Sequence, residues 1–361
     1  MKKFRTTILL PLIILTIISP LFAKDIQCIW NGIERIIAVG DIHGDYKSFV
    51  KILRKTGLID ENLIWKGGKT HLVQTGDIMD RGPDAKKVFD LIMRLEKEAE
   101  AAGGKVHMLI GDHEEINITG IALDYYNYVT PEQFVSFIPQ EYRERREKKQ
   151  KEKLGNKAFE GAKYDFSLSS YLKNFWSDVI KKERTRKNGQ ARMIYVNTFN
   201  DQYGKWILEH NAVIKINDIV FAHGGISKKY STWKLESINY FIRYELIGYR
   251  LMIKGFSRPN SMYKIIYDSR GPLWYRELAR QDEEAFKPKV DEILKDLNAQ
   301  YMVIAHSPLT DSPAVAVELM SRFEGRIWVI DTSISEYIPG GFPSALIIEN
   351  GKFSVFVVTD E

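Results

Sequence analysis

Three short loops rich in glycine, aspartate and histidine lie in the first third of the chain. They are Gly40-Asp41-Ile42-His43-Gly44, Gly76-Asp77-Ile78-Met79-Asp80-Arg81-Gly82 and Gly111-Asp112-His113-Glu114. Each loop follows an apolar run of strand character, and helix-length segments 46–55 and 85–101 lie between the loops. This repetition predicts a β-α-β-α-β unit with a parallel sheet. In such sheets ligands bind at the carboxyl ends of the strands, where these aspartates and histidines fall.

Carboxylate and imidazole groups gathered at strand ends are ligands that suit divalent metal ions. The glycines that flank each loop permit the tight turns and close backbone approach that a metal site requires. A single Gly-Asp pair after a strand is usually only a turn. Three such loops in register, two of them carrying histidine, favour a metal site over three unrelated turns.

The three loops resemble the motifs of the metallophosphoesterases, specifically of the phosphoprotein phosphatase family: Gly-Asp-x-His-Gly, Gly-Asp-x-x-Asp-Arg-Gly and Gly-Asn-His-Glu. The first two are intact, and the third carries Asp112 where the family has asparagine. Segments 222–227 (Ala-His-Gly-Gly-Ile-Ser) and 305–308 (Ala-His-Ser-Pro) look like the two later histidine motifs. Segment 271–276 (Gly-Pro-Leu-Trp-Tyr-Arg) is more similar to the bacterial Shewanella-like branch than to the eukaryotic serine/threonine enzymes. The same holds for the N-terminal residues 1–23, which have the pattern of a secretory signal peptide. The resemblance spans about residues 36–357.

This resemblance implies a site with two divalent metal ions, either manganese or iron with zinc. It assigns Asp41 and His43 to the first ion and Asp77 to both ions as a bridging ligand. The second ion is completed by Asp112, His223 and His306. A hydroxide that bridges the two ions would attack phosphorus in line, so no protein nucleophile is needed. The only cysteine, Cys28, lies outside the motifs, which agrees with such a reaction.

The resemblance also implies roles around the phosphate. His113 would protonate the leaving oxygen, and Asp80 would orient His113 and keep it charged. Arg81 would bind phosphate oxygens through paired donors. A second arginine should face Arg81, with Arg276 as the first choice and Arg270 as the second. For either of these two, a surface salt bridge is the alternative.

Among the other candidate side chains, Glu114, His71 and His107 are expected to be structural. Glu114 follows the proposed acid, His71 and His107 lie within strands, and His210 has no recognisable context.

Asp112 changes the charge of the site. The family's asparagine is a neutral ligand whose amide can also donate to the substrate phosphate. Two divalent ions (+4), Asp41, Asp77 and Asp112 (−3) and a hydroxide (−1) sum to 0, whereas asparagine gives +1. A unit charge about 4 Å from a phosphate is worth on the order of 4 kcal/mol at an effective dielectric near 20. We therefore expect tighter metal binding, weaker phosphate binding and reduced or differently tuned activity.

The chain of 361 residues is long enough for one large α/β domain with insertions. Its net charge of +5 is mild and does not by itself indicate nucleic-acid binding. The resemblance implies a four-layer fold, a two-sheet β-sandwich flanked by helices, over residues 24–361. Within this domain, residues 117–207 are expected to form a partly helical, cap-like insertion over the site.

The N-terminus has the pattern of a secretory signal peptide. A basic start precedes an apolar run at 8–18, and small Ala23 suits a cleavage site after residues 1–23. The mature protein would be periplasmic if the cell is Gram-negative. An uncleaved membrane anchor is the alternative, because residues 6–23 approach spanning length.

Elsewhere the sequence predicts helices, hairpins and strands. The predicted helices span 131–142, with Thr130 as N-cap, and 234–254. A hairpin is predicted for 213–216 with 219–222. Further strands are predicted at 301–305, 326–330, 344–348 and 352–358. The resulting sheets are expected to divide into a parallel half and a more antiparallel half. The mixed-charge run 143–153 favours a solvated helix face or a mobile loop over a nucleic-acid contact.

The leading hypothesis is a phosphomonoester hydrolase whose partner is a phosphorylated protein or peptide, with phosphotyrosine and/or phosphoserine/threonine as the group attacked. A bis(nucleosyl)polyphosphate or other small phosphoester hydrolase is one alternative. A weakly active, phosphatase-like binding protein is another, and Asp112 is its only support. A nucleic-acid partner would rest on basic patches 143–153 and 181–187 and is not expected, and neither is a membrane partner after signal cleavage. The sequence does not specify the oligomeric state.

Overall fold

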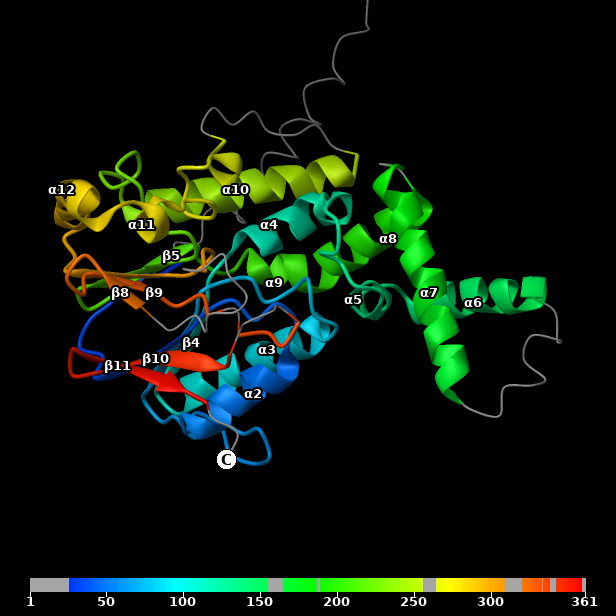
Figure 1. Cartoon of the computed structure of the whole chain (residues 1–361), viewed down its shortest axis with the longest axis horizontal. Coiled ribbons are helices and arrows are strands. Elements are labelled where there is room, and N and C mark those ends of the chain that lie inside the picture. The colour runs from blue at the N-terminus through cyan, green and yellow to red at the C-terminus, as the bar shows by residue number, and fades with distance from the viewer. Residues whose placement is uncertain are drawn as a thin grey trace, which may run out of the picture.

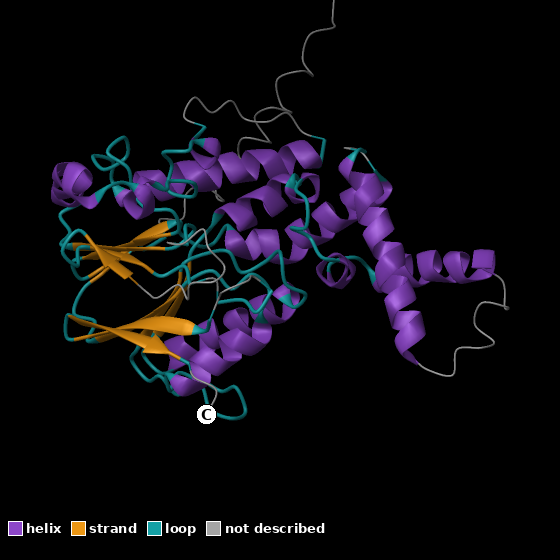
Figure 2. Ribbon diagram, in the orientation of Figure 1, coloured by secondary structure: helices purple, strands orange, loops and turns teal. Residues whose placement is uncertain are grey.

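Two β-sheets form the centre of the fold, and helices cover their outer faces (Figures 1 and 2). This is the predicted α/β sandwich of four layers. A computed structural model describes residues 26–154, 165–186, 189–255, 264–308, 320–332, 334–337 and 342–358. The predicted signal peptide therefore lies outside the described residues. Among the helices described, none is both long enough and apolar enough to cross a bilayer.

The first sheet contains the predicted β-α-β-α-β unit. In the described part of the chain its strand order is β11 (Lys352–Val357), β10 (Ser344–Glu349), β2 (Arg35–Val39), β3 (His71–Gln74) and β4 (Lys105–Met108). Strands β2, β3 and β4 are parallel, and α2 (Tyr46–Lys55) and α3 (Ala85–Ala101) make the crossovers. The apolar run at 36–39 is buried, as expected for a strand covered on both faces.

The second sheet brings the later histidine motifs to the same edge of the sandwich. Among the described residues its order is β1 (Ile29–Trp30), β5 (Val213–Ile216), β6 (Ile219–Ala222), β7 (Tyr301–Ile304), β9 (Ile327–Val329) and β8 (Met320–Arg322). The predicted β5–β6 hairpin is confirmed, and it turns at Asn217, whose φ is 56°.

The predicted division into a parallel half and a more antiparallel half is wrong, because each sheet mixes both kinds of pairing. The last predicted strands also separate: β9 lies in the second sheet, whereas the β10–β11 hairpin lies in the first. Hairpins can be recognised from local turn residues, but pairing across a long connection leaves no local signal. Strand β8 is too short, at three residues, to show a periodic pattern.

The segment 117–207 is helical over most of its described length. It comprises the end of α4 (Asp112–Thr119), η1 (Ala122–Asp124), α5 (Pro131–Ser136), α6 (Gln140–Leu154), α7 (Asp165–Arg184), α8 (Gln190–Phe199), η3 (Asn200–Gly204) and α9 (Lys205–Ile207). Helices α6 and α7 project from the body of the fold (Figure 1). The whole of the mixed-charge run, 143–153, lies in α6.

The helix predicted over 131–142 is two helices. Its start is right, because the Thr130 hydroxyl accepts a hydrogen bond of 3.1 Å from the Gln133 backbone N–H. However, α5 ends at Ser136 and α6 begins at Gln140. Pro139 accounts for the break, because a proline disfavours the helical conformation of the residue before it.

Helix α10 (Leu235–Ile253) matches the predicted helix and is tied to the second sheet by one buried side chain. The Asn239 side-chain oxygen accepts hydrogen bonds from the backbone N–H groups of Ala212 and Val213, at 2.9 and 3.0 Å. Its amide nitrogen donates to the Val213 carbonyl at 2.8 Å. Asn239 thus satisfies polar backbone groups where β5 begins.

Replacing Asn239 with alanine should leave these buried backbone groups unpaired and lower the free energy of unfolding by roughly 1–3 kcal/mol. Urea denaturation monitored by circular dichroism measures this change. Asn62→Ala is the matched control, because Asn62 is exposed in a turn. Equal midpoints for Asn239→Ala and the wild type would contradict the assignment.

Candidate metal centre and catalytic site

All six predicted metal ligands converge at the carboxyl-end edge of the two sheets. The residues from the first sheet are Asp41 and His43 after β2, Asp77 after β3 and Asp112 after β4. The second sheet supplies His223 after β6 and His306 after β7. None of the six is more than 5 % exposed. Residues up to 265 positions apart in the chain thus meet in one buried cluster.

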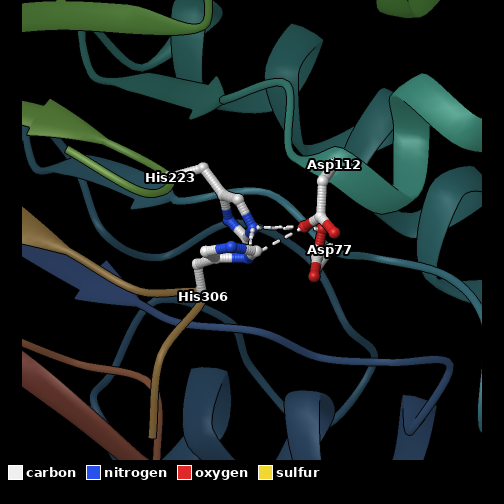
Figure 3. Close-up of side chains that lie close together, drawn as sticks. All are labelled: Asp77, Asp112, His223 and His306. Atoms are coloured by element: carbon white, nitrogen blue, oxygen red, sulfur yellow. Dashed lines mark hydrogen bonds and ion pairs between the residues drawn. The ribbon is translucent and has the colours of Figure 1, made fainter. Parts of the chain in front are cut away.

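One group of donor atoms surrounds Asp112 (Figure 3). Asp112 Oδ1 lies 2.8 Å from His223 Nε2 and 3.0 Å from His306 Nδ1. The two imidazole nitrogens are 3.2 Å apart, and His223 Nε2 is 3.3 Å from Asp77 Oδ1. One ligand atom from each of these four residues lies within 4.8 Å of the others, so a single cation could contact all four.

A second group lies on the other side of Asp77. The Nε2 atom of His43 is 3.9 Å from Asp41 Oδ2 and 3.8 Å from Asp77 Oδ2. The Nε2 atom of His113 is also 3.8 Å from Asp77 Oδ2. Asp77 therefore stands between the two groups, as a bridging ligand must.

The chemistry of this donor set fits a pair of cations. Burial raises the pKa of Asp41 well above its usual range, and the neighbouring carboxylate of Asp331 raises it further. Burial and the carboxylate of Asp112 raise the pKa of Asp77 to about 7. Divalent ions would offset this crowding of negative charge, because a nearby positive charge favours ionised carboxylates. Asp41, His43 and Asp77 would hold one ion, and Asp77, Asp112, His223 and His306 the other.

Several of these side chains sit on strained backbone. The φ angles of His43, Asp77, Asp80, Arg81 and His306 are 48°, 59°, 68°, 68° and 66°, in the left-handed region. Such conformations cost on the order of 1–3 kcal/mol each in non-glycine residues and persist only where the surroundings enforce them. They are concentrated here in the loops that aim the ligands.

Glu114 clamps two of these loops together. Its Oε2 atom accepts hydrogen bonds from the backbone N–H groups of Asp77 and Gly111, at 2.8 and 2.9 Å, and its Oε1 atom accepts one from Ile78 at 2.9 Å. Gly111 must be small, because a Cβ there would collide with the Asp77 carboxylate. Glu114 thus has the structural position expected from the sequence.

The proposed acid, His113, lies next to this cluster. Its Nδ1 atom is 2.7 Å from Asp80 Oδ2, and its ring lies 4.7 Å from the ring of Tyr128. Burial lowers the pKa of His113, but the carboxylates of Asp77 and Asp80 outweigh that effect and raise it to about 9. Arg81 Nη2 is 3.5 Å from His113 Nε2. The Arg81 guanidinium and the His113 imidazole therefore lie side by side.

The two candidates for a second phosphate-binding arginine differ in position. Arg276 Nη1 donates to the carbonyl of His306 at 2.8 Å and lies 3.0 Å from the Ser307 hydroxyl, so it borders the metal cluster. Arg270 is exposed, and its Nε lies 3.6 Å from Asp268 Oδ1. The structure therefore places Arg276 beside a metal ligand and Arg270 in a surface ion pair, which was the alternative for both.

The three other described histidines are hydrogen-bonded. His107 Nε2 and His71 Nδ1 are 2.9 Å apart on adjacent strands, and His210 Nε2 is 2.6 Å from Glu96 Oε1. All three thus have partners away from the metal cluster.

Four residues close to the site carry no recognisable motif. Asp331 follows β9 and acts on the pKa of Asp41. Asn117 and Gln133 donate to the Asp80 carboxylate, and the Tyr195 hydroxyl is hydrogen-bonded to both of these amides. An aspartate directly after a strand could have identified Asp331 by the reasoning applied to the first three loops. Gln133 and Tyr195 belong to helices whose sequence gives no indication of an active site, and Asn117 lies on α4 beyond the Gly-Asp-His-Glu motif.

Comparison with known proteins agrees with this arrangement. Residues 34–309 match the family model of the calcineurin-like phosphoesterases. The chain is 29% identical over 329 residues to Shewanella-like protein phosphatase 1 of Plasmodium berghei, covering 90% of this chain and 73% of that protein. It is 29% identical over 232 residues to Shewanella-like protein phosphatase 2 of Arabidopsis thaliana, covering 60% and 53%. The crystal structure of a cold-active protein-tyrosine phosphatase from a psychrophilic Shewanella has a similar fold, with a TM-score of 0.64 at 24% identity over 94% of this chain and 82% of that one.

Replacing His43 with alanine should reduce tightly bound metal from about two ions per chain to about one, because the first ion loses its only imidazole ligand. Elemental analysis after equilibration with Mn²⁺ and gel filtration measures this content. His71→Ala is the matched control, since it removes a buried histidine outside the cluster. Two retained ions in His43→Ala would refute the assignment of His43.

Proposed function

Because the chain belongs to the calcineurin-like phosphoesterase family, it is a phosphoester hydrolase, and we propose that it removes phosphate from phosphorylated proteins or peptides. The observation that carries the proposal is one buried cluster that unites two groups of metal ligands with the His113–Asp80 pair, 2.7 Å apart. The relatives named above as protein phosphatases support this choice of substrate.

The metal ligands would hold two divalent cations, manganese or an iron–zinc pair. When bound, these cations would neutralise phosphate charge and activate water for attack on phosphorus. Every other role falls to the chain's own residues, which bind the phosphate, orient it and supply the proton.

Arg81 and His113 would divide the work on the substrate. The Arg81 guanidinium would donate paired hydrogen bonds to phosphate oxygens. His113 would donate the proton on Nε2 to the leaving oxygen, because its Nδ1 is engaged with Asp80. Arg276 would assist from beside His306, where it already donates to that residue's carbonyl.

Aromatic side chains beside His113 favour a tyrosine phosphate over a serine or threonine phosphate. Tyr125 and Tyr128 are stacked at 4.9 Å, and Tyr128 also packs against His113. Tyr125 is 39 % exposed, so one of its faces is available to solvent or to a ligand. An aromatic leaving group could pack on these rings in an offset or edge-to-face arrangement.

A substrate panel tests the proposal. With Mn²⁺ present, phosphotyrosine peptides should give a kcat/KM about twofold to tenfold above that of matched phosphoserine peptides, since stacking is worth about 0.5–1.5 kcal/mol per aromatic pair. Diadenosine tetraphosphate is included as the substrate of the main alternative. Faster hydrolysis of the dinucleotide than of every phosphopeptide would overturn the proposal. An absence of turnover with bound metal would favour a phosphate-binding protein.

Asp112 should restrain this activity through its charge. Asp112→Asn keeps an oxygen ligand and removes one negative charge, so kcat/KM should rise about fivefold or more. The upper limit of this effect is the roughly 4 kcal/mol that an unscreened charge contributes at a dielectric near 20. Asp178→Asn, which removes an exposed charge from α7, is the control. An equal or lower kcat/KM for Asp112→Asn at saturating Mn²⁺ would refute the charge argument.

A further inference from the structure

We propose that Gln133, Tyr195 and Asn117 form a positioning network that holds Asp80, and through it the proton donor His113, in the geometry needed for leaving-group protonation. This inference rests on the proposed function. None of the three residues belongs to a catalytic motif, and all three lie in the helical insertion, residues 117–207.

Asp80 is completely buried, and its carboxylate oxygens are fully engaged. Oδ1 accepts a hydrogen bond from Gln133 Nε2 at 2.6 Å. Oδ2 accepts one from Asn117 Nδ2 at 2.8 Å and contacts His113 Nδ1 at 2.7 Å. Two amide donors from separate helices therefore fix the position of the carboxylate that contacts His113.

Gln133 holds Asp80 at two points. Besides its bond to the carboxylate, its Oε1 atom accepts a hydrogen bond from the Asp80 backbone N–H at 2.7 Å. Asp80 has a φ of 68°, so this bond helps to stabilise a backbone conformation that is otherwise unfavourable. The backbone bond also fixes the orientation of the amide, because only the oxygen can accept from that N–H.

Tyr195 closes the network. Its hydroxyl accepts a hydrogen bond from Gln133 Nε2 at 3.0 Å and donates one to Asn117 Oδ1 at 2.9 Å. Asn117 Nδ2 donates its second hydrogen to the carbonyl of His113 at 2.9 Å. The donor and acceptor roles of Gln133, Tyr195 and Asn117 are therefore consistent with one another, and neither side-chain amide can be flipped without losing hydrogen bonds.

The consequence for His113 is a defined tautomer and direction. Since Oδ2 of Asp80 faces Nδ1, that nitrogen donates to Asp80, and the other nitrogen, Nε2, faces the Asp77 side of the metal cluster. Gln133 comes from α5 and Tyr195 from α8, so the helical insertion supports the proton donor through Asp80. The ring of Tyr195 is itself fixed by stacking on Phe134 at 5.0 Å.

The test varies how much the leaving group needs a proton. Tyr195→Phe removes only the hydroxyl and keeps the stacked ring. We expect kcat for phenyl phosphate to fall about tenfold, because its leaving oxygen requires protonation, and this fall is smaller than the 10²–10⁴-fold contribution of the general acid itself. The kcat for 2,4-dinitrophenyl phosphate, whose leaving group departs unprotonated, should change less than about twofold. His113→Ala should show the same selectivity with a larger fall.

Tyr142→Phe is the matched control, because the Tyr142 hydroxyl is buried in α6 of the same insertion and has no hydrogen-bond partner. It should change neither rate. Gln133→Met serves as a second variant if circular dichroism shows that Tyr195→Phe does not fold.

Equal falls on both substrates would mean a general structural role, and no fall on either would mean that the hydroxyl does not position the acid; each result overturns the inference. A wild-type enzyme that hydrolyses neither ester would instead refute the proposed function.

Discussion

Negative charge buried in a small volume is the constraint on which the rest of this structure depends. Asp41, Asp77 and Asp112 share one site with almost no access to water. Burial and mutual repulsion raise the pKa values of Asp41 and Asp77, whereas the imidazoles of His306 and His223 hold the pKa of Asp112 well below its usual range. Imidazoles and cations are the groups that can balance them. The charge excess thus explains both why histidines from the second sheet meet these aspartates and why the family to which the chain belongs depends on metal.

The backbone of the ligand loops is also strained. The loops that present the ligands adopt left-handed conformations, which persist because buried hydrogen bonds over-determine them. Glu114 ties the second and third loops through three backbone N–H groups, and Gln133 holds the Asp80 backbone. A carboxylate that binds only backbone and an amide from a distant helix therefore shape the site as much as the ligands do.

The sequence was sufficient for the parts of this site that depend on local order. Aspartates after apolar runs, with glycines beside them, indicated the parallel unit and the convergence of the ligands, because strand ends share an edge. Sheet membership of β9 and β10 was not predictable, since it depends on pairing across long connections. Gln133 and Tyr195 were missed for the same reason: their contacts with Asp80 and Asn117 join residues 53 and 78 positions apart. Local sequence patterns contain no information on contacts between residues so far apart in the chain.

The ligand set draws on both ends of the chain: four of the six candidates precede residue 113 and two follow residue 222. Bound ions would therefore act as a cross-link between the two sheets, in addition to packing and to hydrogen bonds such as that from the Ile110 N–H to the Asn211 carbonyl. Ligands that bind only the folded state stabilise it by mass action. The supply of metal would then set not only the turnover of this protein but also its resistance to proteolysis, and chains that emerge where cations are scarce would be short-lived.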